Sequence, residues 1–108
     1  MEDVLLGLYD TINDRKENPA EGSYTSYLFK EGLDKILKKV GEECSEVIIA
    51  AKNDSRSDLN YEICDLIYHL LVLMAQKDME LGDLFKELDA RRQKQGNLKQ
   101  TKAVDKNT

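Results

Sequence analysis

Two short groups of acidic residues are spaced so that each would gather its carboxylates on one face of a helix. Glu42, Glu43 and Glu46 form a Glu-Glu-x-x-Glu motif, and Glu62 and Asp65 form a Glu-x-x-Asp motif. Residues three or four positions apart are neighbours on a helix surface. Hard divalent cations prefer oxygen ligands and keep open positions for a phosphate group. If the two helices pack antiparallel, the motifs predict a site for Mg²⁺, with Mn²⁺ as an expected substitute.

The first motif also has a purely structural explanation, whereas Asp65 does not. Glu42 and Glu43 follow Lys38 and Lys39 by four residues, so these side chains could pair on a solvated helix face. Asp65 lies in a segment that is apolar almost all round. Burying an unpaired carboxylate is costly or shifts its pKa until the group is neutral. A metal, a lysine or a proton must therefore compensate Asp65.

His69 is the only histidine of the chain and follows Asp65 by one helical turn. At that position it could orient a carboxylate, contact a phosphate or act as a general base. A histidine that packs in the core with its nitrogens satisfied is the alternative. Tyr68 is expected on the side of the helix away from the acidic strip, where it would pack at a helix interface.

The spacing of apolar residues predicts an all-α chain of four to five helices joined by short polar turns. Apolar positions recur at i, i+3 and i+4, which is typical of helices with one buried face. Ser23 or Thr25 could cap the short second segment, and Ser57 or Asp58 the long apolar one. The expected segments are residues 2–16, 23–30, 33–53, 58–77 and 81–93.

A chain of 108 residues is expected to form one domain with a thin core, because such a domain buries roughly 60–70% of its unfolded surface. We assign residues 1–93 to the helical domain. From Ile63 to Ala75 the sequence is apolar on nearly every side, so this helix should be buried on most sides. The expectation is a helical bundle shared across a homodimer. Residues 94–108 lack apolar spacing and are interpreted as a mobile tail.

Composition and charge exclude several classes of function. The chain carries 21 acidic and 16 basic residues, a net charge of −5. An acidic body disfavours sequence-independent nucleic-acid binding, which needs a basic face. The N-terminus, Met1-Glu2-Asp3, lacks a basic and apolar leader, and no apolar run has membrane-spanning length, so a cytoplasmic location without membrane contact is expected. Cys44 and Cys64 are expected to be reduced rather than in a disulfide or a zinc site.

The sequence resembles the phosphoribosyl-ATP pyrophosphatases over roughly residues 4–92. The two acidic motifs alone are shared by the wider MazG-like group of all-helical nucleotide pyrophosphohydrolases. The Ser-Tyr-Thr and Asp-Leu-x-Tyr-His stretches narrow the resemblance to the phosphoribosyl-ATP branch. The segments that carry it include Ser23-Tyr24-Thr25, Lys39-Val40-Gly41-Glu42-Glu43, Glu46-Val47-Ile48-Ile49-Ala50-Ala51-Lys52 and Glu62-x-x-Asp65-Leu66-x-Tyr68-His69.

The resemblance implies hydrolysis of phosphoribosyl-ATP to phosphoribosyl-AMP and pyrophosphate, the second step of histidine biosynthesis, on a homodimer. Attack by a metal-activated water on the phosphate adjoining the nucleoside is expected. Residues matching the family's metal-binding positions are Glu42, Glu43, Glu46, Glu62 and Asp65. Glu43, Glu46 and His69 are the catalytic candidates. Lys39, Lys52 and Arg56 are candidates for phosphate contacts, with solvated side chains as the alternative.

Three other functions compete with this one. A housecleaning pyrophosphohydrolase of nucleoside triphosphates would use the same chemistry on another substrate. A noncatalytic helical dimerisation module would explain the apolar helix but leaves Asp65 unexplained. A di-iron oxidoreductase would need Glu-x-x-His motifs on two helices, whereas His69 is the only histidine.

Overall fold

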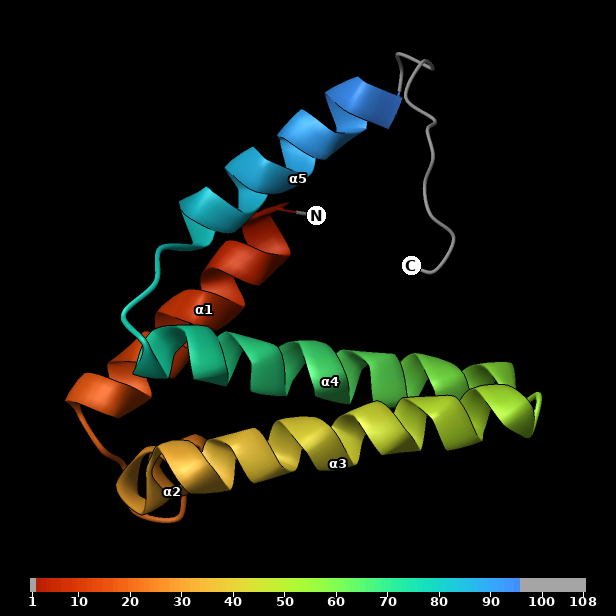
Figure 1. The fold of residues 1–108 in the computed structure, drawn as a ribbon. Helices are drawn as coiled ribbons and strands as arrows, with labels where there is room; N and C mark the ends of the chain where they lie inside the picture. Colours follow the sequence, from red (N-terminus) through yellow and green to blue (C-terminus); the bar gives the residue numbers. More distant parts are fainter. Residues whose placement is uncertain (1, 96–108) are drawn as a thin grey trace.

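The computed structural model describes residues 2–95, which form five helices and no strand (Figure 1). The all-helical prediction is confirmed, and each expected segment corresponds to one helix. The last helix continues past its expected end at Gln93, and residues 96–108, which hold most of the predicted tail, lie outside the described residues. The helices are α1 (Glu2–Glu17), α2 (Tyr24–Glu31), α3 (Leu33–Lys52), α4 (Arg56–Gln76) and α5 (Leu81–Gln95).

The two longest helices, α3 and α4, lie side by side and run in opposite directions (Figure 1). A short turn joins them, in which Asp54 adopts a left-handed backbone with φ of 58°. The side chain of Ser55 caps α4 by accepting a hydrogen bond from the backbone N–H of Asp58 at 3.3 Å. The predicted caps Ser57 and Asp58 are therefore wrong, because the left-handed residue reverses the chain earlier than the sequence pattern indicated.

The hydrophobic core lies where α1, α2 and the start of α3 meet the C-terminal half of α4 and the start of α5. Tyr9 is also tied to the turn after α4, because its hydroxyl donates to the backbone carbonyl of Met79 at 2.6 Å. Lys16 bonds the carbonyl of Ala75 and the carboxylate of Asp78, both at 2.7 Å. The buried apolar residues of this cluster are Tyr9, Ile12, Leu28, Ile36, Leu71, Val72, Met74, Ala75 and Leu81.

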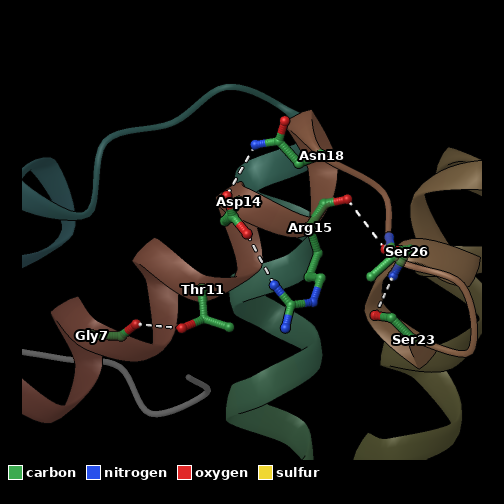
Figure 2. A network of polar contacts seen from close by, with 8 residues as sticks. Gly7, Thr11, Asp14, Arg15, Asn18, Ser23 and Ser26 are labelled. Atoms are coloured by element: carbon green, nitrogen blue, oxygen red, sulfur yellow. Dashed lines mark hydrogen bonds and ion pairs between the residues drawn. The ribbon is translucent and has the colours of Figure 1, made fainter.

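The start of α2 is fixed to the end of α1 by hydrogen bonds around Ser26 (Figure 2). The Ser26 hydroxyl donates to the carbonyl of Arg15 at 3.3 Å and accepts from the backbone N–H of Ala20 at 3.0 Å. The backbone N–H of Ser26 donates to the hydroxyl of Ser23, the N-cap of α2, at 3.1 Å. These bonds fix the start of α2 relative to α1, and residues of its first turn reach α4.

One face of the α3–α4 hairpin remains uncovered. The expectation that α4 is buried on most sides is wrong within a single chain, because α3 and α1 cover only part of its circumference. The exposed apolar side chains of the two helices include Leu37, Ile48, Ile49, Ile63, Ile67 and Leu70. Among residues 2–95, no helix combines the length and the apolar content needed to cross a membrane.

Candidate active site

Three of the five predicted metal ligands meet between α3 and α4. Glu43 comes from α3, and Glu62 and Asp65 come from successive turns of α4. Each offers a carboxylate oxygen, and these oxygens all lie within 4.8 Å of one another. Glu43 is buried, with 8% of its surface exposed, and the other two are half-buried. We call Glu43, Glu62 and Asp65 the carboxylate cluster.

One oxygen of the carboxylate cluster is buried and has no hydrogen-bond partner within residues 2–95. Glu43 Oε1 is buried without a hydrogen bond among the described residues. Its other oxygen lies 3.7 Å from the ammonium of Lys39. A buried polar atom without a partner costs roughly 1–3 kcal/mol, and more when it is charged. A cation bound among the three carboxylates would satisfy this oxygen, so the residues present fit a hard divalent metal ion.

The negative charges of the site act on one another. Burial raises the pKa of Glu62 above the ordinary 4.5, and the neighbouring carboxylates of Glu46, Glu43 and Asp65 raise it further. At the neighbouring position of α3, the hydrogen bond from Lys39 lowers the pKa of Glu42. The carboxylate cluster thus holds more negative charge than its single lysine offsets.

The other two predicted ligands lie outside the cluster. Glu42 is exposed and accepts a hydrogen bond from Lys39 at 3.1 Å, which is the pairing that the lysine spacing allowed. Glu46 is exposed one turn after Glu43, close enough for its charge to raise the pKa of Glu62. These two carboxylates border the site on its solvent side.

His69 is almost completely buried, at 3% exposure, and both of its ring nitrogens are engaged. Nδ1 lies 2.8 Å from the backbone carbonyl of Asp65, which can only accept, so Nδ1 carries the hydrogen of the neutral ring. Nε2 then accepts from the hydroxyl of Tyr24 at 3.0 Å. This tautomer is assigned from the hydrogen-bond partners.

Sequence reasoning considered Thr25 only as a possible helix cap and gave Tyr24 no role, yet both residues of α2 meet α4 beside the cluster, and Ser23 is the cap. Tyr24 bonds His69, and the hydroxyl of Thr25 bonds the hydroxyl of Tyr68. Tyr68 therefore packs against α2, in keeping with its interpretation as a residue of a helix interface. The available signal was the Ser-Tyr-Thr segment, which helped to indicate the family but was not linked to any site.

The remaining candidates are spread along the hairpin. Lys39 contacts both Glu42 and Glu43. Lys52 and Arg56 are exposed at the far turn, at the end of α3 and the start of α4, and no hydrogen bond or ion pair joins them to the carboxylate cluster within residues 2–95. Cys44 and Cys64 are free thiols on exposed positions.

Comparison with known proteins decides which family this arrangement represents. Residues 5–92 match the phosphoribosyl-ATP pyrophosphohydrolase family. The chain belongs to this family. The resemblance inferred from the acidic motifs and the Ser-Tyr-Thr segment is thereby confirmed, and the matched range includes the whole carboxylate cluster.

Individual relatives of the phosphoribosyl-ATP pyrophosphohydrolase family align over most of the chain. The phosphoribosyl-ATP pyrophosphatase of Clostridium novyi is 59% identical over 97 residues, which are 90% of this chain and 88% of the relative. That of Clostridium acetobutylicum is 59% identical over 98 residues, 91% of this chain and 89% of the relative. The histidine biosynthesis bifunctional protein HisIE of Caldanaerobacter subterraneus is 56% identical over 92 residues, but these make up only 45% of that protein.

Proposed function

We propose that this chain hydrolyses phosphoribosyl-ATP to phosphoribosyl-AMP and pyrophosphate in histidine biosynthesis, with Mg²⁺ as its cofactor. Membership of the phosphoribosyl-ATP pyrophosphohydrolase family and the names of its relatives support the substrate. The observation that carries the chemistry is that carboxylate oxygens of Glu43, Glu62 and Asp65 lie within 4.8 Å of one another, while Oε1 of Glu43 is buried without a hydrogen bond among the described residues. Burying such a group costs free energy unless a cation or a proton compensates it, and a bound metal ion would do so.

In this proposal Glu43, Glu62 and Asp65 hold the metal, and Glu42 and Glu46 complete the acidic site from its solvent side. Mg²⁺ bound there would neutralise phosphate charge and make a bound water more acidic. The reaction adds the oxygen of water to the phosphorus next to the nucleoside and breaks its bond to the bridging oxygen, so that pyrophosphate leaves. Glu46 is exposed and has no ion pair within the described residues, and it is our candidate to accept the proton of the water.

The basic residues and His69 take different parts in this scheme. Lys39 lies at the carboxylate cluster and can exchange its carboxylate partners for a phosphate oxygen. Lys52 and Arg56, at the hairpin turn, would contact the far end of the substrate's phosphate chain. His69 acts through its bonds to Tyr24 and Asp65 as a positioning residue, because neither nitrogen is available to take a proton from water.

A homodimer is the second part of the proposal. The uncovered hairpin face contains Ile48 and Ile49 of α3, exposed to 63% and 52%, and α4 exposes further apolar side chains, among them Ile63 at 40%. Exposed apolar side chains in this number favour an interaction site over a solvated surface. Because the same hairpin carries the carboxylate cluster, a second copy packed on this face would stiffen the site.

A pyrophosphate-release assay tests the proposed function. Phosphoribosyl-ATP is compared with a panel of nucleoside triphosphates, each with and without Mg²⁺. The proposal requires Mg²⁺-dependent release that is fastest with phosphoribosyl-ATP. Faster release from the triphosphates would favour the housecleaning alternative, and no release from any substrate would favour a noncatalytic module.

A further inference from the structure

Two tyrosine rings of α2 form an exposed pair beside the candidate active site. Tyr24 and Tyr27 are three positions apart and therefore share one face of the helix. They are 44% and 43% exposed, their ring centroids are 6.1 Å apart and their planes differ by 27°. Neither ring belongs to the buried core. The exposed parts of these two rings offer aromatic surface against which another ring can pack.

The inner end of this pair is held rigidly by α4. Tyr24 stacks on Tyr68, with centroids 6.3 Å apart and planes 28° apart, and meets the edge of the His69 ring at 5.7 Å. Its hydroxyl is bonded to His69 Nε2. The ring of Tyr24 is therefore fixed in orientation before any ligand arrives, which reduces the entropy lost on binding.

The aromatic pair is linked to the carboxylate cluster by short connections. His69 follows Asp65 by one turn of α4 and bonds its carbonyl at 2.8 Å. The Tyr24 hydroxyl in turn lies 3.0 Å from Nε2 of the same His69 ring, so one imidazole joins the phenol to the turn of α4 that begins at Asp65. The open ring surface thus borders the place where the phosphates would bind.

Two lysines of α3 place positive charge near the Tyr27 ring. The ammonium of Lys35 lies 5.8 Å from the centroid of the Tyr27 ring, and Lys39 is one turn further along α3. A ligand with one flat aromatic end and one polyanionic end would use all of these groups. A nucleotide has this combination.

We propose that Tyr24 and Tyr27 form the surface on which the nucleobase of the substrate stacks, with Tyr27 as the contact that determines specificity for a nucleotide over a bare polyphosphate. The inference rests on the proposed function, because it requires the phosphates to be held at the carboxylate cluster. Among the stacked rings of Tyr68, Tyr24 and Tyr27, Tyr27 lies farthest from α4. It therefore offers a stacking contact that the metal site itself does not provide.

Binding of two probes to the full chain tests this inference. Isothermal titration calorimetry in Mg²⁺ measures the Kd of α,β-methylene-ATP, whose bridge resists cleavage, and of tripolyphosphate, which has no base. Stacking of one base on an aromatic side chain changes affinity by roughly 5- to 150-fold. Tyr27→Leu should therefore weaken binding of the nucleotide by about tenfold and leave tripolyphosphate unchanged. Tyr27→Phe, which keeps the ring, should restore nucleotide binding.

Tyr61→Leu is the matched control, because Tyr61 is an exposed tyrosine of α4 for which no ring partner is found among residues 2–95. It should leave the ratio of the two dissociation constants unchanged. Equal effects of Tyr27→Leu on both probes, or no effect on either, would overturn the stacking surface. Failure of the unaltered protein to bind either probe in a Mg²⁺-dependent way would instead overturn the proposed metal site.

Discussion

Tyr24 and His69, 45 positions apart in the sequence, are joined by a 3.0 Å hydrogen bond in which the phenol donates to the imidazole. The direction follows from the opposite ring nitrogen, which faces the backbone carbonyl of Asp65. The bond therefore links the first residue of α2 to the turn of α4 that follows the proposed metal ligand Asp65. It makes the exposed Tyr24 and the buried His69 a single structural unit.

The energetic coupling between Tyr24 and His69 should be measurable in the free energy of unfolding. Tyr24→Phe leaves the buried Nε2 of His69 without a donor, so we expect a loss of roughly 1–3 kcal/mol in the free energy of unfolding. Adding His69→Leu removes the stranded acceptor, and the double variant should be more stable than the sum of the single changes predicts, by about 0.5–3 kcal/mol. Urea denaturation of the unaltered protein, the two single variants and the double variant gives the free energies of unfolding for this double-mutant cycle. Strictly additive losses would show that the bond contributes nothing.

Asp65→Asn should separate metal binding from folding. The change removes one charge from the carboxylate cluster at nearly constant shape, so the metal-free variant should be as stable as the unaltered protein or slightly more so. Mg²⁺ at about 100 times its Kd should stabilise the unaltered protein by about 2.7 kcal/mol. The variant should lose this response, and its hydrolysis should fall by more than about 100-fold. Thermal melts with and without Mg²⁺, beside the assay, provide the measurement.

Asp10→Asn on α1 serves as the control for a lost negative charge, because Asp10 is exposed and outside the cluster. It should keep both the Mg²⁺ response and the activity. If Asp65→Asn were strongly destabilised without metal yet still hydrolysed substrate, Asp65 would be a structural partner of another group rather than a ligand.

The pH dependence of stability should report on Glu62. Its pKa is raised above 4.5, mainly by burial and then by Glu46 and Glu43, so the folded chain holds this proton more tightly than the unfolded chain. The free energy of unfolding of the metal-free protein should therefore fall as pH rises from 4.5 through the raised pKa. Mg²⁺ competes with the same proton, so its binding should strengthen over that interval.

Glu62→Gln should abolish this part of the pH dependence, whereas Glu31→Gln, at the exposed end of α2, should not. Melts and Mg²⁺ titrations at about pH 5 and about pH 8 span the range in which a carboxyl with a raised pKa titrates. If the stability of Glu62→Gln depended on pH in the same way as that of the unaltered protein, the pH dependence would come from the other carboxylates.

The uncovered hairpin face should hold two copies together. Light scattering at micromolar concentration is expected to give at least twice the chain mass of 12.4 kDa. Ile48→Glu would bury a charge in the interface and should weaken association by roughly 100-fold or more. Met79→Glu, at an exposed apolar residue after α4, is the control and should leave the mass unchanged. A folded and active monomer of the unaltered chain would contradict the dimer.

The helices could be predicted from the sequence because each depends on local spacing of apolar residues, and α3 and α4 show this spacing over many turns. The two acidic motifs were visible for the same reason, since each lies on one helix. The cap at Ser55 was missed because it depends on the left-handed backbone at Asp54, which the sequence pattern does not reveal.

The inner structure of the site could not be predicted, because it depends on how α3 is rotated against α4. Successive helix residues point about 100° apart. Glu43 therefore faces Asp65, while Glu42 points toward Lys39 and solvent. The bond from Tyr24 to His69 depends in addition on where the α1–α2 connection places α2.

Lys39 already provides a positive charge at the edge of the acidic site. Its ammonium reaches Glu42 at 3.1 Å and Glu43 at 3.7 Å, so part of the repulsion is relieved while the chain folds without an ion. The same ammonium would compete with a cation that binds at Glu43. If Mg²⁺ is the cofactor, as proposed, Lys39 would offset part of the acidic charge again whenever the ion leaves the site.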